Sequence, residues 1–514
     1  MGIPSYYSYL IKNFKNIVQK KELFNENIHN FYLDSNSIVY DILHKKDVDI
    51  NNDEEIIKNV CLKIEEYIRC INATELVYIS FDGIAPVAKL KQQKERRFKS
   101  KLVNMDSDKK SFDTAKITPG TKFMELLDKR VNEFFRGREN IYGVKKIVVS
   151  SAKERGEGEH KIFDDIRTTK HKNHVIYGLD ADLIIISLNN LNYANNIFLF
   201  RETPEFIKSL NYSLDPNKLY FMNVNNLKLV IEKNMIFSER CKNDKVIKDY
   251  VFLMMLMGND FMPHFPSLNI RTFGLQMMLD VYKMVINKHK LNLLNDNNRI
   301  IWKNVRELFK YFSENEHNNL KKEYKIREKI TRGIEYKLKT EDDRLVNLPV
   351  INKEKEEYID PNSLHWENRY YETLHRMERT ETNVNKICMN YLEGLVWNME
   401  YYTNGCFNWT WYYKYSYPPL FCDLIKHTPL WDIDLIQEDN SNIDDIEQLS
   451  YVLPVESCYL LPEEIRDKVV KYKENNEVLI DWSYCRYFWE SHIDFVDEDL
   501  KELRSIIKNN DVVI

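Results

Sequence analysis

The chain has 514 residues, of which 43% are hydrophobic and 30% are charged, and its formal net charge is −5. A chain of this length can bury a large core and form more than one domain, and its composition excludes a disordered protein. The net negative charge also excludes a wholly basic protein that coats nucleic acid, but it is compatible with an enzyme that has a local basic track.

Residues 1–290 alternate strand-like and helical segments, which is typical of a mostly parallel α/β sheet with helices on both faces. Strands are expected at Ile28–Asp34, Leu76–Asp82, Lys146–Ser151, Val175–Asp182 and Asn196–Phe200. Helices are expected at Glu54–Cys70, Pro86–Lys101, Lys122–Phe135 and Lys245–Met257.

The chain changes character after residue 290. Residues 313–360 are rich in Lys and Glu, which indicates a solvated, partly helical connector, with an ordinary pair of surface helices as the alternative. Residues 361–514 hold seven of the eight Trp and form a second, mainly helical region that we expect to pack against the sheet. We therefore predict three parts, at 1–290, 291–360 and 361–514.

Acidic residues stand at or just beyond the ends of the first four predicted strands, and one more follows an apolar helix. The carboxyl ends of parallel strands share one edge, where α/β sheets place their ligand site. Two carboxylates about 4 Å apart repel by roughly 4 kcal/mol at an effective dielectric constant of about 20, so a cluster of acids needs cations to stay ionised. The sequence therefore predicts a divalent-metal site formed by Asp34, Asp82, Glu157, Glu159, Asp180, Asp182 and Asp260.

The acids differ in how strongly their sequence context indicates a metal site. Asp180 and Asp182 are expected to share one face of a strand, and they lie between apolar runs, where an unpaired acid is costly. Glu157 and Glu159 belong in a turn or a first helical turn, and a solvated turn is the alternative. Asp34, like Asp82, would by itself suit a turn or a helix cap equally well.

The segment from Asp82 to Lys101 is basic and helical by composition. Lys89, Gln93, Arg96 and Arg97 follow at i, i+4, i+7 and i+8, so they share one face directly beyond Asp82. Guanidinium and ammonium groups suit a terminal phosphate. A solvated basic face is the alternative, but the neighbouring carboxylates favour a phosphate pocket.

These segments together resemble the Xrn-type 5′→3′ exoribonucleases. The first part matches through MGIPSYY at the start, YLDSNSIVY (32–40), FDGIAPVAKLKQQKERRF (81–98), ITPGTKFM (117–124), GEGEHKI (156–162), YGLDADLIIISL (177–188) and MGNDFMPHFPSL (257–268). The second region matches through YLEGLVWNMEYYTNGCFNWTWYYKYSYPP (391–419), QLSYVLPVES (448–457) and RYFWESH (486–492). The matches follow the family order over nearly the whole chain and imply a short form with the two catalytic regions only.

The resemblance implies a PIN- or flap-nuclease-like domain at 1–290 and a second region that completes the active-site pocket. The seven carboxylates would hold two Mg²⁺ ions, for which Mn²⁺ could substitute, and would hydrolyse single-stranded RNA to nucleoside monophosphates. Lys89, Gln93, Arg96 and Arg97 would bind its 5′-monophosphate. The first base would stack between Tyr40, where the family usually has His, and either Trp409 or Trp411. A Tyr is a poor proton donor near neutral pH, so a role that needs an imidazole is not expected.

Two other functions stay open, a flap-type 5′ DNA nuclease and a catalytically inactive RNA-binding scaffold. The eight cysteines form no CxxC pair, which indicates a reduced intracellular protein without a zinc site. We find no signal peptide, and the longest apolar run, Val251–Met257, is too short to span a bilayer. We therefore expect a monomer that acts in mRNA decay in the cytoplasm, with the nucleus as the alternative location.

Overall fold

The structure is a computed structural model, and it describes residues 2–14, 16–45, 47–104, 112–169, 171–178, 180–204, 207–496 and 498–508. The chain folds into two compact units. The sheet unit comprises Tyr7–Val230, Asn440–Asn475 and Glu498–Ile514. The helical unit comprises Met1–Tyr6, Ile231–Asp439 and Asn476–Asp497. Each unit thus joins distant parts of the sequence, and the predicted boundaries at 290 and 360 stay a prediction.

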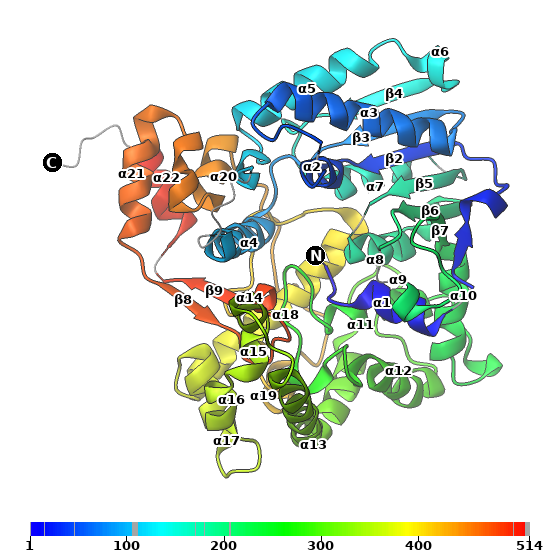
Figure 1. Cartoon of the computed structure of the whole chain (residues 1–514). Coiled ribbons are helices and arrows are strands. Elements are labelled where there is room, and N and C mark those ends of the chain that lie inside the picture. The colour runs from blue at the N-terminus through cyan, green and yellow to red at the C-terminus, as the bar shows by residue number, and fades with distance from the viewer. Residues whose placement is uncertain are drawn as a thin grey trace. The chain divides into compact units, whose positions relative to one another are not determined.

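A seven-stranded sheet with the strand order β1-β7-β6-β5-β2-β3-β4 forms the centre of the sheet unit (Figure 1). Its strands are β1 (Val18–Lys20), β2 (Asn30–Asp34), β3 (Leu76–Ser80), β4 (Lys146–Ser150), β5 (Asn173–Tyr177), β6 (Asn196–Arg201) and β7 (Tyr220–Asn223). Strands β2 to β6 pair in parallel, and β7 pairs antiparallel with both β6 and β1. The predicted mostly parallel sheet is confirmed, whereas the short antiparallel strands β1 and β7 were not predicted.

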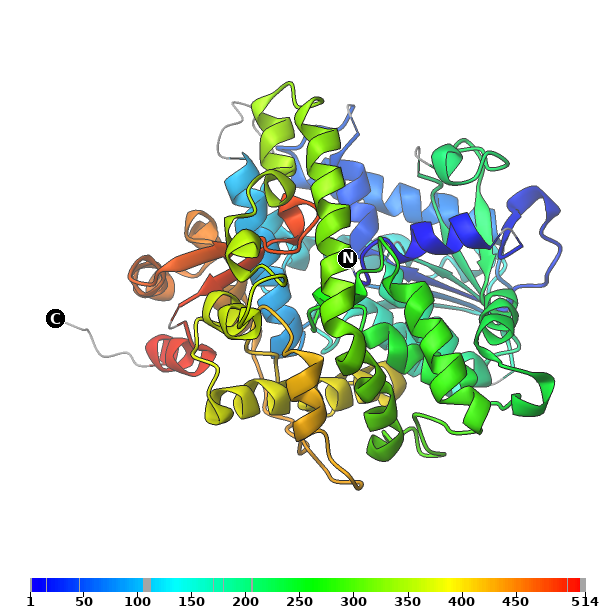
Figure 2. The same ribbon diagram turned by 90° about the horizontal axis from the view of Figure 1, so that it is seen from below.

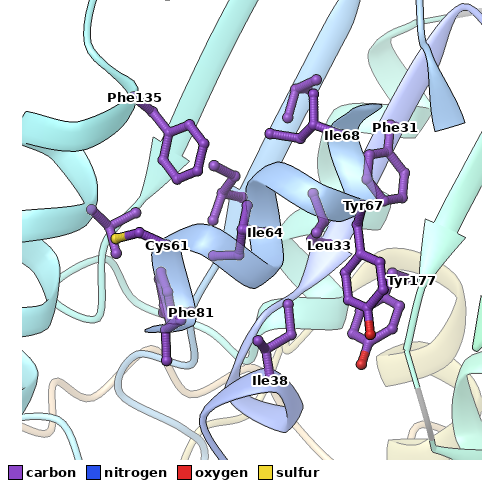
Figure 3. Close-up of a cluster of buried hydrophobic side chains, with 14 of the residues drawn as sticks. Phe31, Leu33, Ile38, Cys61, Ile64, Tyr67, Ile68, Phe81, Phe135 and Tyr177 are labelled. Carbon is purple, nitrogen blue, oxygen red and sulfur yellow. The ribbon is translucent and has the colours of Figure 1, made fainter. Parts of the chain in front are cut away.

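Helices cover both faces of this sheet, as predicted. The helices that belong to or border the sheet unit are α1 (Tyr6–Asn13), α2 (Asn36–Leu43), α3 (Asp53–Ile71), α4 (Val87–Asn104), α5 (Lys122–Phe135), α6 (Glu139–Tyr142), α7 (Gly158–Thr168), α8 (Ala181–Asn189), α9 (Ile207–Leu210), α10 (Val224–Met235), α20 (Asp445–Val452), α21 (Glu463–Glu474) and α22 (Leu500–Lys508). Phe31 and Leu33 of β2 face the apolar side of α3, and Figure 3 shows them in one cluster with Ile64, Tyr67 and Ile68 of that helix. The residue between them points to the opposite face, because side chains alternate along a strand. There the Tyr32 hydroxyl donates to Asp165 of α7 at 2.7 Å.

The helical unit contains the remaining helices and a two-stranded hairpin. They are α11 (Val246–Met255), α12 (Gly274–Val285), α13 (Trp302–Glu335), α14 (Glu341–Val346), α15 (Leu348–Ile351), α16 (Glu354–Ile359), α17 (Trp366–Tyr370), α18 (Glu381–Asn404), α19 (Phe421–His427), β8 (Val478–Asp481) and β9 (His492–Phe495). Among the described residues, no helix has both the length and the apolar character needed to cross a bilayer. All eight cysteines are free thiols.

The charged segment 313–360 that we expected to be a solvated, partly helical connector is mostly helical. Its first part belongs to the 34-residue helix α13 (Figure 2), and α14, α15 and α16 follow. One face of α13 is buried together with charged side chains. The Arg327 guanidinium donates two hydrogen bonds to Glu356 and one each to the carbonyls of Cys485 and Pro349. Because these partners come from distant segments, the composition of α13 alone does not reveal that its polar residues lie inside.

Candidate active site

The ends of the parallel strands β2 and β3 bring two acids to the start of α7. Asp34 is the last residue of β2 and is aligned with Ser80, the last residue of β3. The backbone N–H of Gly158 donates to Asp82 Oδ1 at 2.7 Å. A Cβ atom on Gly158 would lie 2.8 Å from Asp34 Oδ1 and 3.3 Å from Asp82 Oδ1. The glycine therefore allows the first turn of α7 to approach both carboxylates.

The two glutamates of the GEGE segment lie at the beginning of α7. Glu157 is the N-cap residue and Glu159 is in the first turn, as the sequence predicts. Glu157 is buried, and its Oε2 lies 2.7 Å from the Lys89 ammonium of α4. The buried Lys161 ammonium donates to the carbonyls of Phe81 and Ser151, at 3.0 and 2.8 Å. These bonds fix α7 to the segments that follow β3 and β4.

The expectation that Asp180 and Asp182 lie on a strand is wrong. Strand β5 ends at Tyr177, Asp180 is the N-cap residue of α8, and Asp182 is in its first turn. Helix N-termini favour negative charge because their first N–H groups have no partner within the helix. The alternation of side chains along a strand therefore does not explain why these two acids lie in the same cluster.

The surroundings of Asp34 show that the acids interact. Removal from water is the main cause that raises the pKa of Asp34 well above its ordinary value. The neighbouring Asp82 and Asp180 carboxylates raise this pKa further, whereas the Lys89 ammonium opposes them. Asp34 Oδ1 has no hydrogen-bond partner among the described residues. A buried acceptor without a partner is costly, so this oxygen has the capacity to bind a cation.

Glu159 shows the same effects as Asp34. Burial raises the pKa of Glu159 well above its ordinary value, and the Glu157 carboxylate is the next largest cause. Asp182 and Asp180 also raise it. Six of the seven predicted acids therefore influence one another within the sheet unit.

This donor set fits a divalent metal ion by its chemistry. All six side chains offer carboxylate oxygens, which are the ligands preferred by Mg²⁺ and Mn²⁺. As placed, no three His, Cys, Asp or Glu side chains in the described part of the chain are close enough together to hold one ion. The role of each acid as a metal ligand stays a prediction.

The predicted phosphate-binding helix is α4, and its basic face is largely buried. Lys89, Gln93 and Arg97 are all less than a tenth exposed, and Arg96 is half-buried. Burial lowers the pKa of Arg97 to about 10, and the nearby Tyr40 phenol opposes this shift. Neither Arg97 Nη1 nor Gln93 Oε1 forms a hydrogen bond with a described residue. Buried polar atoms normally have partners, so this face has unused capacity to bind a polar ligand such as phosphate.

Comparison with known proteins assigns the chain to a family. Residues 1–203 match the family model "XRN 5'-3' exonuclease N-terminus", and residues 240–363 and 351–488 match "Xrn1 helical domain". The chain belongs to the XRN 5′-3′ exonuclease family. The resemblance inferred from the sequence is thereby confirmed.

Relatives from several eukaryotes have similar sequences. The 5'-3' exoribonuclease 1 of Schizosaccharomyces pombe is 26% identical over 97% of this chain and 48% of its own length. The protein of the same name from Saccharomyces cerevisiae is 25% identical over 97% of this chain and 42% of its own length. The human one is 27% identical over 90% of this chain and 31% of its own length. The chain thus spans less than half the length of these relatives.

Two polar residues that we did not predict help to position the acids of this family member. The Asn36 amide donates to Asp82 Oδ2 at 2.8 Å, and its oxygen accepts from the Asp82 N–H at 3.2 Å. The Ser80 hydroxyl donates to the Gly158 carbonyl at 3.1 Å. Asn36 is the first residue of α2, directly after the strand that ends at Asp34. A polar residue at the start of such a helix is the signal that could have found it.

The predicted stacking residues lie in different units. Tyr40 is half-buried on α2 of the sheet unit, whereas Trp409 and Trp411 belong to the helical unit and are both 8% exposed. The Trp411 ring stacks on Trp397 at 5.1 Å, and its Nε1–H donates to Glu393 at 3.3 Å. Base stacking by Tyr40 and by either Trp stays a prediction.

The seventh predicted acid also lies in the helical unit. Asp260 is half-buried, and its Oδ1 accepts from the backbone N–H of Gly2 at 2.9 Å. This bond ties the start of the chain to the segment after α11. The role of Asp260 as a metal ligand stays a prediction.

Proposed function

We propose that the chain is a Mg²⁺-dependent 5′→3′ exoribonuclease that removes nucleoside monophosphates from single-stranded RNA with a 5′-monophosphate. The observation that carries the proposal is the 2.7 Å contact of Lys89 with Glu157. This contact links the carboxylate cluster directly to the basic face of α4, on which some buried polar atoms have no hydrogen-bond partner among the described residues. A hydrolytic centre beside an anion-binding face suits an enzyme that binds the terminal phosphate of RNA and cleaves at a fixed distance from it. Relatives named 5'-3' exoribonucleases support the same reading.

The six carboxylates of the sheet unit would hold two divalent ions. When bound, such ions activate water for attack at phosphorus and neutralise charge on the leaving group. The chain's own contribution is to hold the acids in place before the substrate arrives. Asp82 is fixed from two sides, by the Gly158 N–H and by the Asn36 amide, which leaves little freedom to its carboxylate.

The basic face of α4 would receive the terminal phosphate. Lys89, Gln93 and Arg97 supply an ammonium, an amide and a guanidinium from successive turns of the helix, and Arg96 would complete the set. Charge-assisted hydrogen bonds to phosphate are about twice as strong as neutral ones. If this buried face encloses the terminal phosphate, it would exclude a cap or a triphosphate by size, and it would fix which phosphodiester bond is cleaved.

Stacking would hold the RNA without reading its sequence. Tyr40 lies near Arg97, so a base beside its ring would belong to the nucleotide whose phosphate occupies the basic face. Aromatic stacking gives roughly 1–3 kcal/mol per base and tolerates every base. We therefore expect a sequence-tolerant enzyme whose RNA affinity falls steeply with salt.

Digestion of RNAs that differ only at the 5′ end tests this function. Wild-type protein should degrade a 5′-monophosphate RNA to nucleoside monophosphates in the presence of Mg²⁺, and it should be far slower on the 5′-triphosphate and 5′-hydroxyl forms. EDTA should stop the reaction. Faster cleavage of a 5′-flap DNA, or equal rates on all three RNAs, would contradict the proposal.

A further inference from the structure

The helical unit contains a cavity of about 400 Å³ beside α13. Pockets for small ligands usually measure about 300–1,000 Å³. Its walls come from the segment before α12, from α13 and from the loop after β8, and they include Arg271, Phe273, Glu323, Arg327 and Arg486. The cavity is therefore large enough for a ligand and combines cationic, aromatic and aliphatic side chains.

Part of this lining is already satisfied within the protein. The Glu323 carboxylate accepts from the Asn269 amide at 2.9 Å and from the Thr272 hydroxyl at 2.8 Å. The Arg327 guanidinium is bound by Glu356 and by two backbone carbonyls. These groups form a polar part of the cavity wall. Their hydrogen bonds are made within the protein, so they do not need a ligand as a partner.

Arg486 differs from these groups. Its guanidinium donates one hydrogen bond to the Asn347 amide oxygen at 3.1 Å and lies 4.3 Å from the centroid of the Tyr487 ring. No carboxylate of a described residue pairs with its guanidinium. A guanidinium has five N–H donors, so most of its capacity stays available. Arg271 also lines the cavity, although its guanidinium is bound by Glu490.

An aromatic surface adjoins these arginines. The Tyr487 and Trp489 rings stack at 4.3 Å with an interplanar angle of 13°, and Trp489 is 46% exposed. Phe273, Ile326 and Ile330 form an apolar wall of the cavity itself. Guanidinium groups bind phosphate through paired N–H donors, and flat rings stack on aromatic side chains. A ligand with both a phosphate and a flat ring matches this combination.

We propose that this cavity is a nucleotide-binding site in which Arg486 binds the phosphate. The ligand is either a free mononucleotide or one nucleotide of an RNA strand, since both offer the same chemistry. The choice of a nucleotide rests on the proposed function, because such an enzyme always has RNA and its monophosphate products at hand. The site itself is argued from the cavity and can be tested without catalysis.

Isothermal titration calorimetry in EDTA tests the proposal while hydrolysis is blocked. The protein carries Arg97→Ala, which weakens binding at the basic face of α4. The titrants are AMP, adenosine, inorganic phosphate and a 5′-hydroxyl oligoadenylate. Adding Arg486→Ala should weaken AMP binding by about tenfold or more, and Arg486→Lys should restore only part of it. Arg332→Ala is the matched control, because Arg332 is exposed on α13 and pairs with Glu328 outside the cavity.

The titrants separate the two sources of the ligand. Binding of AMP that depends on Arg486 supports a site for free mononucleotides, and binding of the oligoadenylate alone supports a site for the RNA strand. Equal affinity for inorganic phosphate and AMP would overturn the nucleotide assignment. Unchanged AMP affinity in the Arg486→Ala variant would also overturn the proposal, provided that its circular dichroism spectrum resembles that of the control. Because no step needs hydrolysis, a failed digestion assay leaves this result interpretable.

Discussion

The Lys89 ammonium lies 2.7 Å from Glu157 Oε2, and this ion pair joins the basic helix α4 to the carboxylate cluster at the start of α7. The Lys89 and Glu157 side chains are 11% and 4% exposed. The Coulombic attraction within an ion pair that is shielded from water in this way is larger than within a surface pair. If the proposed function is correct, this one contact would couple recognition of the RNA end to hydrolysis.

Replacing Lys89 by Ala should reduce the preference for a 5′-phosphate. The change removes one of the cations that would bind the terminal phosphate, and one charge-assisted contact is worth about tenfold in rate or affinity. We expect kcat/KM on 5′-monophosphate RNA to fall by at least about tenfold, with a smaller effect on 5′-hydroxyl RNA. Lys91→Ala on the same helix is the control. Equal losses on both RNAs would show that Lys89 does not recognise the phosphate.

Replacing Gly158 by Ala should impair the metal site without unfolding α7. The backbone N–H that bonds to Asp82 is kept, but the new Cβ would lie 2.8 Å from Asp34 Oδ1. We expect a higher Mg²⁺ concentration for half-maximal activity and at least about a tenfold lower rate at limiting Mg²⁺, since small displacements of catalytic groups are costly.

Gly333→Ala is the matched control for this experiment. No atom lies within 4 Å of a Cβ built on Gly333, which belongs to α13. Ala is the better helix former, so this variant should gain up to about 1 kcal/mol of stability and keep full activity. Normal Mg²⁺ dependence of Gly158→Ala would show that the close approach of α7 to the acids has no catalytic role.

Replacing Glu498 by Gln should destabilise the sheet unit and disturb α4. The buried Glu498 pairs with the buried Lys94 of α4, and it also offsets the charge of Lys473. Burial, followed by the nearby Lys473, lowers the pKa of Lys94 to about 7. Breaking a buried ion pair costs about 3–5 kcal/mol. Urea denaturation should show a loss of this order, and KM for 5′-phosphorylated RNA should rise because Gln93 is adjacent to Lys94.

Glu22→Gln provides the comparison for Glu498. Glu22 pairs with Lys218 on the surface, where the side chains are 53% and 49% exposed. Surface pairs contribute little to stability, so this variant should unfold at the wild-type urea concentration. Similar behaviour of the two variants would mean that the Lys94–Glu498 pair does not support α4.

Asp249 should make the stability of the helical unit depend on pH. Burial raises the pKa of Asp249 to about 7 in the folded protein, compared with about 3.9 when unfolded. Between these values the folded state binds more protons, so stability falls as pH rises from about 4 to 7. Asp249→Asn should remove this component, and the variant should gain stability relative to wild type as the pH increases.

Urea denaturation at pH 5.5 and pH 8 measures this effect. Asn can still accept from the N–H groups of Leu293 and Leu294, which lie 3.0 and 3.1 Å from Asp249 Oδ1. Asp280→Asn, at an exposed position on α12, should show the same difference from wild type at both pH values. A constant difference for Asp249→Asn as well would contradict the predicted titration.

The sequence was sufficient for those parts of the fold and site that depend on local patterns. Strands β2 to β6 were found because each is a short apolar run followed by a turn. The position of Glu157 and Glu159 at a helix start followed from the flanking glycines. The placement of Asp180 and Asp182 failed because the apolar run continues on both sides of them, and nothing in it marks where β5 stops and α8 begins.

The other differences have a common cause, which is contact between distant segments. The charged residues of α13 look solvated in the sequence, yet Arg327 is buried against Glu356 and two carbonyls. Asn36 supports Asp82 across 46 positions of the chain. Such partners are set by tertiary packing, and no local pattern encodes them. The short strands β1 and β7 depend in the same way on the strands that pair with them.

The central claim is that the clustered acids perform hydrolysis rather than support the fold, and Asp34→Asn tests it most directly. RNA binding and single-turnover degradation of a 5′-monophosphate RNA in Mg²⁺ are measured on the same preparations of wild type and variant. We predict that the variant binds RNA with near wild-type affinity and degrades it at least about a thousandfold more slowly, as expected when a metal ligand is lost. Degradation at the wild-type rate would contradict the account.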